Sequence, residues 1–204
     1  MTSAPVRLTR AQSRQRTRDL LVAAAMQVFT RDGYAGASVD AIAAQAGFTV
    51  GALYSNFATK QELFLAVFEA HCANEVAALA ALVEDSPGVE ALLAAVTEQV
   101  AGLDQAHRDW WTLWAELWLY AQRHPDLATR LAAVQAQTRA MIATALAPAG
   151  PEKAAAAHAL WTGFMMCRLV DPQALPADTL THAVQWLLAG HAADPIAPDP
   201  GGQQ

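Results

Sequence analysis

The chain has 204 residues, of which 54% are hydrophobic and 16% charged, and its formal net charge is -6. An apolar share this large can fill a core, which excludes a disordered chain. Only Cys72 and Cys167 are present, far apart, so we expect neither a disulfide framework nor a cysteine metal site. No apolar stretch precedes Leu20, and we therefore expect a cytoplasmic protein without a signal peptide or a membrane span.

The charge is distributed unevenly along the chain. Residues 1–60 carry seven basic and three acidic side chains, whereas residues 61–204 carry six basic and sixteen acidic ones. Such asymmetry indicates a nucleic acid as the partner of the basic end, although a solvated N-terminal face would have the same composition.

Helical spacing of apolar residues and capping signals predict four helices in the first third of the chain. They are expected at residues 14–30, 38–46, 49–56 and from 59 onward. Gly33 is a stop signal after the first helix. Ser38 and Thr49 are suitable N-caps for the second and third, and residues 59–62, Thr-Lys-Gln-Glu, have the form of a capping box.

The rest of the chain is also predicted to be helical. Breaks are expected at residues 85–88, 104–109, 124–125, 148–151 and 171–176. No segment shows the sustained alternation of a strand. We therefore predict an all-α protein of about nine helices, an N-terminal three-helix helix-turn-helix domain followed by a C-terminal helical bundle. The predicted boundaries are 1–58, with a flexible basic arm over 1–13, then 59–192, and a flexible tail over 193–204.

The third predicted helix has a composition that its own stability does not explain. Gly51, Tyr54, Ser55 and Asn56 are mediocre or poor helix formers, and so short a helix needs tertiary support. Two short helices joined by a tight turn with a glycine are typical of a helix-turn-helix, whose second helix enters the major groove. Gly51 permits close approach to DNA, and the short polar side chains can contact phosphates or bases. An irregular packed turn is the alternative.

These residues resemble the DNA-binding domain of the TetR (tetracycline repressor) family. The resemblance covers about a third of the chain and rests on residues 36–43, 46–49, 51–57, 60 and 62–64. It implies a homodimeric repressor that binds a palindromic operator and is released when a small molecule binds. The DNA-binding residues that it implies are Ser38, Thr49, Val50, Gly51, Tyr54, Ser55, Asn56 and Lys60.

Within this set the resemblance places Ser38, Thr49, Tyr54 and Lys60 at phosphates. Val50 is a departure, because many members carry a basic residue there; a valine cannot bind phosphate but can touch a thymine methyl group. The arginines further upstream, Arg7, Arg10 and Arg14, either reach the DNA backbone or minor groove or form a solubilising arm.

All six tryptophans follow residue 109, and Trp110, Trp111, Trp114 and Trp118 share one arc of a helix. Aromatic stripes usually fill cores, but several large rings together can also wall a small-molecule pocket. Because the family encloses an inducer there, we predict a pocket for a flat hydrophobic, aromatic or cationic compound. Its predicted residues are Trp110, Trp114, Trp118, Met141, Phe164 and Met165. Glu116, on the opposite side of the helix, is expected to face solvent.

The resemblance also implies that the last two helices form the dimer contact. The residues predicted for it are Trp161, Leu169, Val184, Leu187 and Leu188, with a place in the chain's own core as the alternative. Two-fold symmetry of the protein would match a palindromic operator.

Three other functions fit the sequence less well. An enzyme is disfavoured because no glycine-rich phosphate loop, Glu-x-x-His pair or catalytic triad is apparent, and His71 with Glu75 offers too few ligands for a metal. We therefore predict no catalytic residue, metal or cofactor. A family member that answers to a protein partner is a second alternative. An architectural DNA-binding protein is disfavoured by the acidic larger domain.

Overall fold

The structure, a computed structural model, describes residues 9–102, 105–147 and 149–190. Within these ranges it contains nine α-helices and no strand, as the sequence predicts. The helices are α1 (Arg10–Gly36), α2 (Val39–Ala46), α3 (Val50–Tyr54), α4 (Lys60–Asp85), α5 (Val89–Ala101), α6 (Gln105–Ala121), α7 (Pro125–Ala145), α8 (Pro151–Val170) and α9 (Ala177–Ala189).

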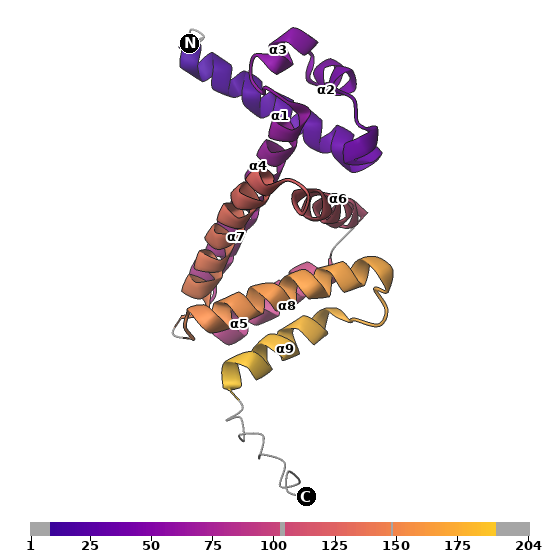
Figure 1. The fold of residues 1–204 in the computed structure, drawn as a ribbon. Helices are drawn as coiled ribbons and strands as arrows, with labels where there is room; N and C mark the ends of the chain where they lie inside the picture. Colours follow the sequence, from indigo (N-terminus) through magenta and orange to yellow (C-terminus); the bar gives the residue numbers. More distant parts are fainter. Residues whose placement is uncertain (1–8, 103–104, 148, 191–204) are drawn as a thin grey trace, which may run out of the picture.

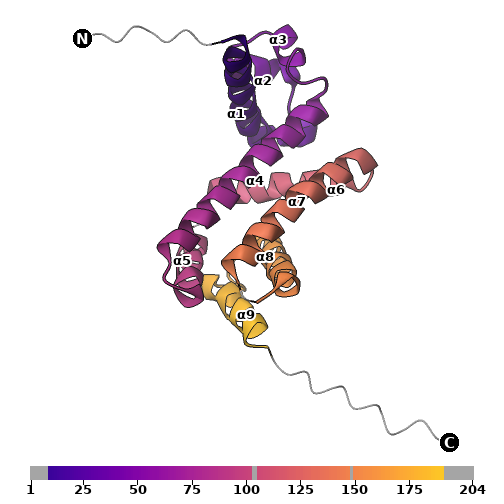
Figure 2. The ribbon, with the colours of Figure 1, turned by 90° about the vertical axis from the view of Figure 1, so that its left-hand side faces the viewer.

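The helices form two units that α4 connects. Figure 1 shows α1, α2 and α3 at one end of the molecule and α8 and α9 toward the other, with α4 running from the first unit into the second. The turned view in Figure 2 shows α7 beside α4, and these two helices are in contact. Helix α6 contacts α1, α7 and α8, so it lies between the units. The domain boundary at residue 58 stays a prediction.

Helix α1 begins at Arg10, four residues before the predicted start. Thr9 and Gln12 form a capping box: Thr9 Oγ1 accepts from the Gln12 amide at 3.2 Å, and Gln12 Oε1 accepts from the Thr9 amide at 2.9 Å. Residues 10–13 of the predicted flexible arm are therefore helical. Residues 1–8 of that arm, and the predicted tail, lie outside the described residues.

The predicted break at residues 104–109 is wrong for all but its first residue, because α6 begins at Gln105. Residue 104 itself lies outside the described residues. The Gln105 side chain donates to Asp109 Oδ1 at 2.6 Å and accepts from Arg108 Nε at 3.0 Å. This polar run is therefore an exposed first helical turn rather than a loop. Helix α3 is shorter than predicted, since it ends at Tyr54 instead of near Asn56.

The core is continuous through the first part of α4. Six consecutive residues, 63–68, are buried there, because α1 packs on one side of the helix and α7 on another. Aromatic rings extend this contact: the ring centroids of Phe64 lie 4.9 Å from Phe29 and 4.5 Å from Tyr34. By length and composition alone α4 could also cross a membrane, with a mean hydropathy of 1.4 in one window, but core helices of soluble proteins pass the same test.

Helices α4 and α6 meet through a second group of rings. The centroid of Trp110 lies 4.5 Å from that of Phe68 and 3.5 Å from that of His71, whose ring is stacked on it. Burial, with a smaller effect from His107, lowers the pKa of His71 to about 4. The imidazole is therefore neutral at neutral pH in the folded protein.

This burial predicts a loss of stability in mild acid. The pKa of His71 is lower in the folded chain than the ordinary 6.5, so the unfolded chain binds a proton first as the pH falls below 6.5. The contribution is present at neutral pH and is lost progressively down to pH 4. At pH 5 we expect His71 to cost about 2 kcal/mol of unfolding free energy.

Denaturant unfolding at pH 7 and pH 5 measures this effect. A His71→Phe variant should lose less unfolding free energy between the two values than the wild type. His182, which is exposed, provides the control, and His182→Phe should behave like the wild type. Equal losses in wild type and His71→Phe would contradict the buried neutral histidine.

Candidate functional site

The turn between α2 and α3 has the geometry of a helix-turn-helix. Gly47 ends α2 in the left-handed conformation, with φ 74° and ψ 27°, and the Phe48 amide donates to the Ala43 carbonyl at 2.9 Å. A residue with a Cβ would be strained at this φ. Thr49 then caps α3, because its Oγ1 accepts from the Ala52 amide at 3.1 Å. Two helices are thereby joined by three residues.

One side of α3 is fully buried and the other is open. Leu53 on the helix and Phe57 just after it have no exposed surface, while Tyr54 is 50% exposed. Thr49, Gly51 and Ser55 are exposed too. A Cβ added at Gly51 would meet only Thr49 Oγ1, at 3.9 Å, so packing within the chain does not require a glycine there. The predicted reading helix thus presents a narrow, uncharged and polar surface.

Of the eight residues predicted to bind DNA, three are partly buried within the chain. Val50 is half-buried against the core. Asn56 Nδ2 donates to the Ala52 carbonyl at 2.9 Å, and its Oδ1 is buried without a hydrogen-bond partner among the described residues. Lys60 Nζ lies 4.6 Å from the ring centroid of Tyr34, and burial lowers its pKa. The other five are exposed: Ser38, Thr49, Gly51, Tyr54 and Ser55.

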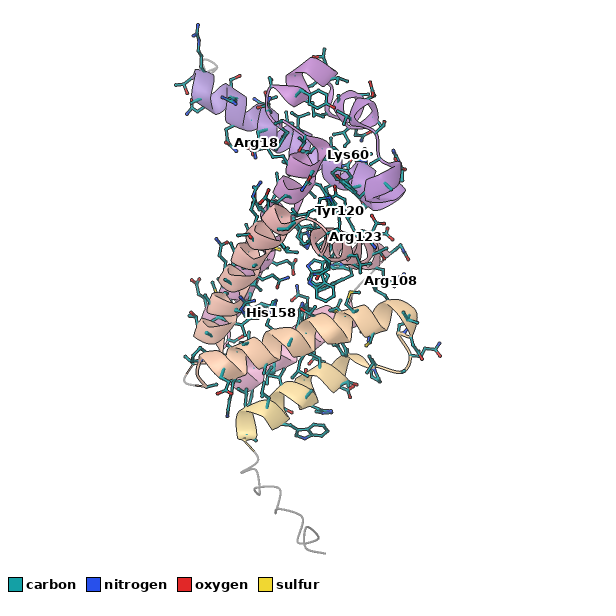
Figure 3. All side chains as sticks on the ribbon, viewed as in Figure 1. Arg18, Lys60, Arg108, Tyr120, Arg123 and His158 are labelled. Atoms are coloured by element: carbon teal, nitrogen blue, oxygen red, sulfur yellow. The ribbon has the colours of Figure 1, made fainter. Side chains whose placement is uncertain are left out.

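Two arginines of α1 donate hydrogen bonds to main-chain carbonyls just after the C-terminal end of α3. Arg18 Nη1 donates to the Asn56 carbonyl at 2.9 Å, and its guanidinium lies 4.0 Å from the ring centroid of Phe57. Arg14 Nη2 donates to the Ser55 carbonyl at 3.4 Å. Cations are favourable at the carbonyl end of a helix. This role was not predicted from the sequence, although the spacing of four places both arginines on one face of α1. Figure 3 labels Arg18 on this helix.

The larger unit contains a mainly apolar cavity of about 170 Å³. Its walls come from α4, α5, α7, α8 and α9, and include Val76, Leu79, Leu93, Ile142, Leu180 and Val184. The polar side chains on its wall are Glu75, Gln99, Thr138 and Thr181. Such a cavity suits an apolar group with a few polar contacts.

A second cavity, of about 90 Å³, is aromatic and polar. Four tryptophans and three histidines line it: Trp110, Trp111, Trp114, Trp161, His71, His107 and His158. His158, labelled in Figure 3, comes from α8, and burial lowers its pKa. Glu75, Gln99, Thr138 and Trp161 line both cavities, so the two adjoin.

Some of the residues predicted to bind the effector line a cavity, and the others do not. Trp110, Trp114 and Met165 line the second cavity. Trp118 is 50% exposed and stacks on Trp114, with centroids 6.0 Å apart, while Phe164 is buried beside Arg168. Neither lines a cavity described above, nor does Met141. The histidines and the apolar cavity were not predicted from the sequence, because the residues of each cavity come from five helices and no single helix pattern brings them together.

Glu116 does not face solvent as predicted; it joins α6 to the end of α1. Its Oε2 accepts from the Tyr34 main-chain amide at 2.7 Å. Gly33, with φ 69° and ψ 169°, kinks α1 just before this amide, and a Cβ on Gly33 would lie 3.0 Å from Glu116 Oε1. The Tyr34 ring packs against Tyr120 with centroids 5.0 Å apart, and burial followed by the Tyr120 hydroxyl raises the pKa of Tyr34 to about 12.

Helix α6 therefore takes part in two contacts. Its first half supplies Trp110, Trp111 and Trp114 to the cavity wall, and its second half supplies Glu116 and Tyr120 to the first unit. Figure 3 shows Tyr120 near Lys60, at the junction of the units. Because both contacts are made by one helix, a displacement of α6 at the cavity would also displace its contact with α1.

The residues predicted for a dimer contact mostly face inward. Val184 is buried, and the other four are partly buried against the chain's own core: Trp161, Leu169, Leu187 and Leu188. The exposed residues of α8 and α9 are different ones. Trp186 is 69% exposed and Val170 89%, and the exposed side of α8 also presents Leu160, Gly163 and Cys167.

Comparisons with known proteins agree with both units. Residues 21–67 match the family model described as bacterial regulatory proteins, tetR family, and residues 88–193 match the C-terminal domain of BetI-type transcriptional repressors. The chain is 33% identical over 123 residues to the transcriptional repressor NicS of Pseudomonas putida, a match that covers 60% of this chain and half the length of that curated relative.

Two solved structures have the same fold. A transcriptional regulator from Rhodococcus sp. Rha1 is 27% identical with a TM-score of 0.63, covering 84% of this chain and 94% of that one. The multidrug binding protein EbrR, solved with imidazole, is 26% identical with a TM-score of 0.65, covering 86% and 97%. Both family models describe transcriptional regulators, which are not enzymes. This chain belongs to the TetR family of transcriptional regulators.

Proposed function

We propose that the protein is a repressor that binds a palindromic operator as a homodimer and leaves it when a small hydrophobic or aromatic molecule enters the C-terminal cavities. The observation that carries this proposal is α3, a short helix anchored by Leu53 and Phe57 whose other side exposes only small or polar groups and Tyr54. Both NicS, a repressor, and EbrR, a multidrug binding protein, support it. Such a protein acts in the cytoplasm, where the DNA is.

The exposed residues suggest how the contacts are divided. Ser38 and Thr49 have hydroxyl groups at helix N-termini, where phosphate oxygens are bound favourably, and the exposed Tyr54 has a hydroxyl group that can donate to a phosphate. Gly51 and Ser55 would lie nearest to the base edges. Lys60 would have to leave the Tyr34 ring to reach a phosphate. Val50 and Asn56 would position α3 rather than read bases.

The exposed side of α8 and α9 supports a dimer. Its residues Leu160, Gly163, Cys167, Val170 and Trp186 are uncharged, and large exposed apolar side chains are typical of an interface. A two-fold axis through this face would place the same patch on both subunits. The two α3 helices would then read half-sites about 34–36 Å apart, one turn of DNA.

Helix α6 offers a route from effector to DNA. An effector that favours a different position of Trp110, Trp111 and Trp114 also changes the position of Glu116 and Tyr120, which contact α1. The effector would shift the population toward dimers in which the distance between the two α3 helices does not match successive major grooves of the DNA. Coupling of this kind is typically about 1–3 kcal/mol, and DNA must weaken effector binding by the same factor.

Selection of bound fragments from the source genome tests the function directly. At two salt concentrations, we expect the purified full chain to recover a short imperfect palindrome, with an affinity that falls steeply as salt rises because phosphate contacts release counterions. Recovery of random fragments that are lost at moderate salt would overturn the proposal of a dimeric sequence reader.

Gly51→Ala separates folding from DNA binding. Alanine is the better helix former and has room here, so the unfolding free energy should stay equal or rise by up to about 1 kcal/mol. The added methyl group would hold α3 away from the bases, and operator binding should weaken by about 1–3 kcal/mol, the scale of one lost base contact.

The matched control is Gly36→Ala, at an exposed glycine of α1 whose added Cβ would make an ordinary contact of 3.7 Å with Asp32. It should leave operator affinity unchanged in a mobility-shift or anisotropy titration. An unchanged affinity for Gly51→Ala would exclude close approach of this backbone to DNA.

Trp186→Glu tests the dimer face. A carboxylate at this exposed position would have to be desolvated in the dimer, so sedimentation should find monomers, and operator affinity should fall, while circular dichroism stays helical. Leu119→Glu is the control, because Leu119 is 65% exposed on α6 and is not part of the exposed face of α8 and α9. A Trp186→Glu protein that remains dimeric would rule out this face.

A further inference from the structure

We propose that the effector is an amphiphilic cation whose positive head lies beside Glu75, against the tryptophans of the smaller cavity, and whose apolar part occupies the larger cavity. This inference deepens the proposed function, because it requires that the two cavities are the effector site. It adds the charge of the effector and the residue that selects it.

The position of Glu75 carries the first step. Its side chain lines both cavities and is therefore located where they adjoin. Among the described residues on these two walls it is the only Asp, Glu, Lys or Arg. A negative head would meet a carboxylate with no Lys or Arg on the wall to offset it, whereas a cation would find an opposite charge.

Two histidines on the wall of the smaller cavity, His71 and His107, interact with Glu75. The Nε2 atom of His71 lies 3.7 Å from Glu75 Oε1, beyond hydrogen-bond distance. Because burial keeps His71 neutral near pH 7, this contact is not an ion pair there. Partial desolvation raises the pKa of the Glu75 carboxyl, and His107 lowers it to a smaller extent, so a cation beside Glu75 would favour the charged form that partial desolvation disfavours. The side chain remains 53% exposed, which leaves it accessible to a ligand.

The aromatic walls favour the same charge. Trp111 lies 5.5 Å from Trp114 and 6.4 Å from Trp161 between ring centroids, with interplanar angles of 50° and 60°. Rings tilted in this way do not stack on one another fully, and all three residues line the cavity. Faces of tryptophan attract cations within about 6 Å of the centroid, most strongly where water is excluded.

The larger cavity indicates the chemistry of the rest of the ligand. Its volume of about 170 Å³ is nearly twice that of the aromatic cavity, and most of its wall is aliphatic. An alkyl chain or aryl group would be buried there favourably. Because Gln99 and Thr138 line both cavities, polar groups near the head can be hydrogen-bonded at the junction.

A series of probes with one chain and three head groups tests this inference on the full-length protein. The probes are decyltrimethylammonium, decanol and decanoate, and their binding is measured by calorimetry at neutral pH. We expect the ammonium to bind about tenfold more tightly than either of the others. Glu75→Gln should reduce its affinity to that of decanol and leave decanol unaffected.

Glu84→Gln is the matched control, since Glu84 is an exposed carboxylate on the same helix and lines neither cavity. It should bind all three probes as the wild type does. Equal affinity for decanol or decanoate, or unchanged ammonium affinity in Glu75→Gln, would overturn the choice of a cation while leaving the cavities as an effector site. Failure of all three probes to bind would overturn the inference too, whereas operator selection decides the repressor function separately.

Discussion

The burial of residues 63–68 in the first part of α4 is the contact on which both units depend. Four large side chains of this run, Leu63, Phe64, Val67 and Phe68, have almost no exposed surface, and each such burial is worth about 1.5–3 kcal/mol. Helices α1 and α7 bury their own apolar sides against α4, and one continuous core results. A cut near residue 58 would therefore separate two functions but divide one core, since the first unit would lose the helix that covers Phe29.

This shared core explains how the five-residue helix α3 can be ordered and act as the recognition helix. Helix α3 is too short to be stable alone, and its order comes from the Thr49 cap, the buried Leu53 and Phe57, and the arginines at its carbonyl end. All of these lie on the side facing the protein or at the helix ends. On the exposed side, Gly51 and Tyr54 contribute little to this packing, so residues at these positions can be selected for DNA binding.

Local signals in the sequence were sufficient for the fold and for the helix-turn-helix, because caps and glycines act over three or four residues: Ser38, Gly47, Thr49 and Thr59 all cap as expected. The partner that each helix face contacts was harder to predict from the sequence. Periodicity shows which residues share a side, but not whether that side meets the chain's own core, a ligand or a second subunit. Helix α8 is apolar on most sides, so Trp161 and Leu169 could not be distinguished from Leu160 and Val170. Glu116 was misplaced because its partner is a main-chain amide 82 positions away, which no side-chain pattern reveals.

The hydrogen bond between Glu116 and the Tyr34 amide has unequal partners, and this has an evolutionary consequence. The donor belongs to the main chain, so any residue except proline at position 34 retains it, whereas the acceptor depends on one side chain. The residue at position 33 is constrained as well, because a side chain there would be strained at its φ and would crowd the Glu116 carboxylate. Substitutions at position 34 would alter the ring contacts of Tyr34 with Phe64 and Tyr120 but would keep this hydrogen bond. Position 33 is therefore expected to remain glycine, and position 116 is expected to retain a side chain that can accept this hydrogen bond.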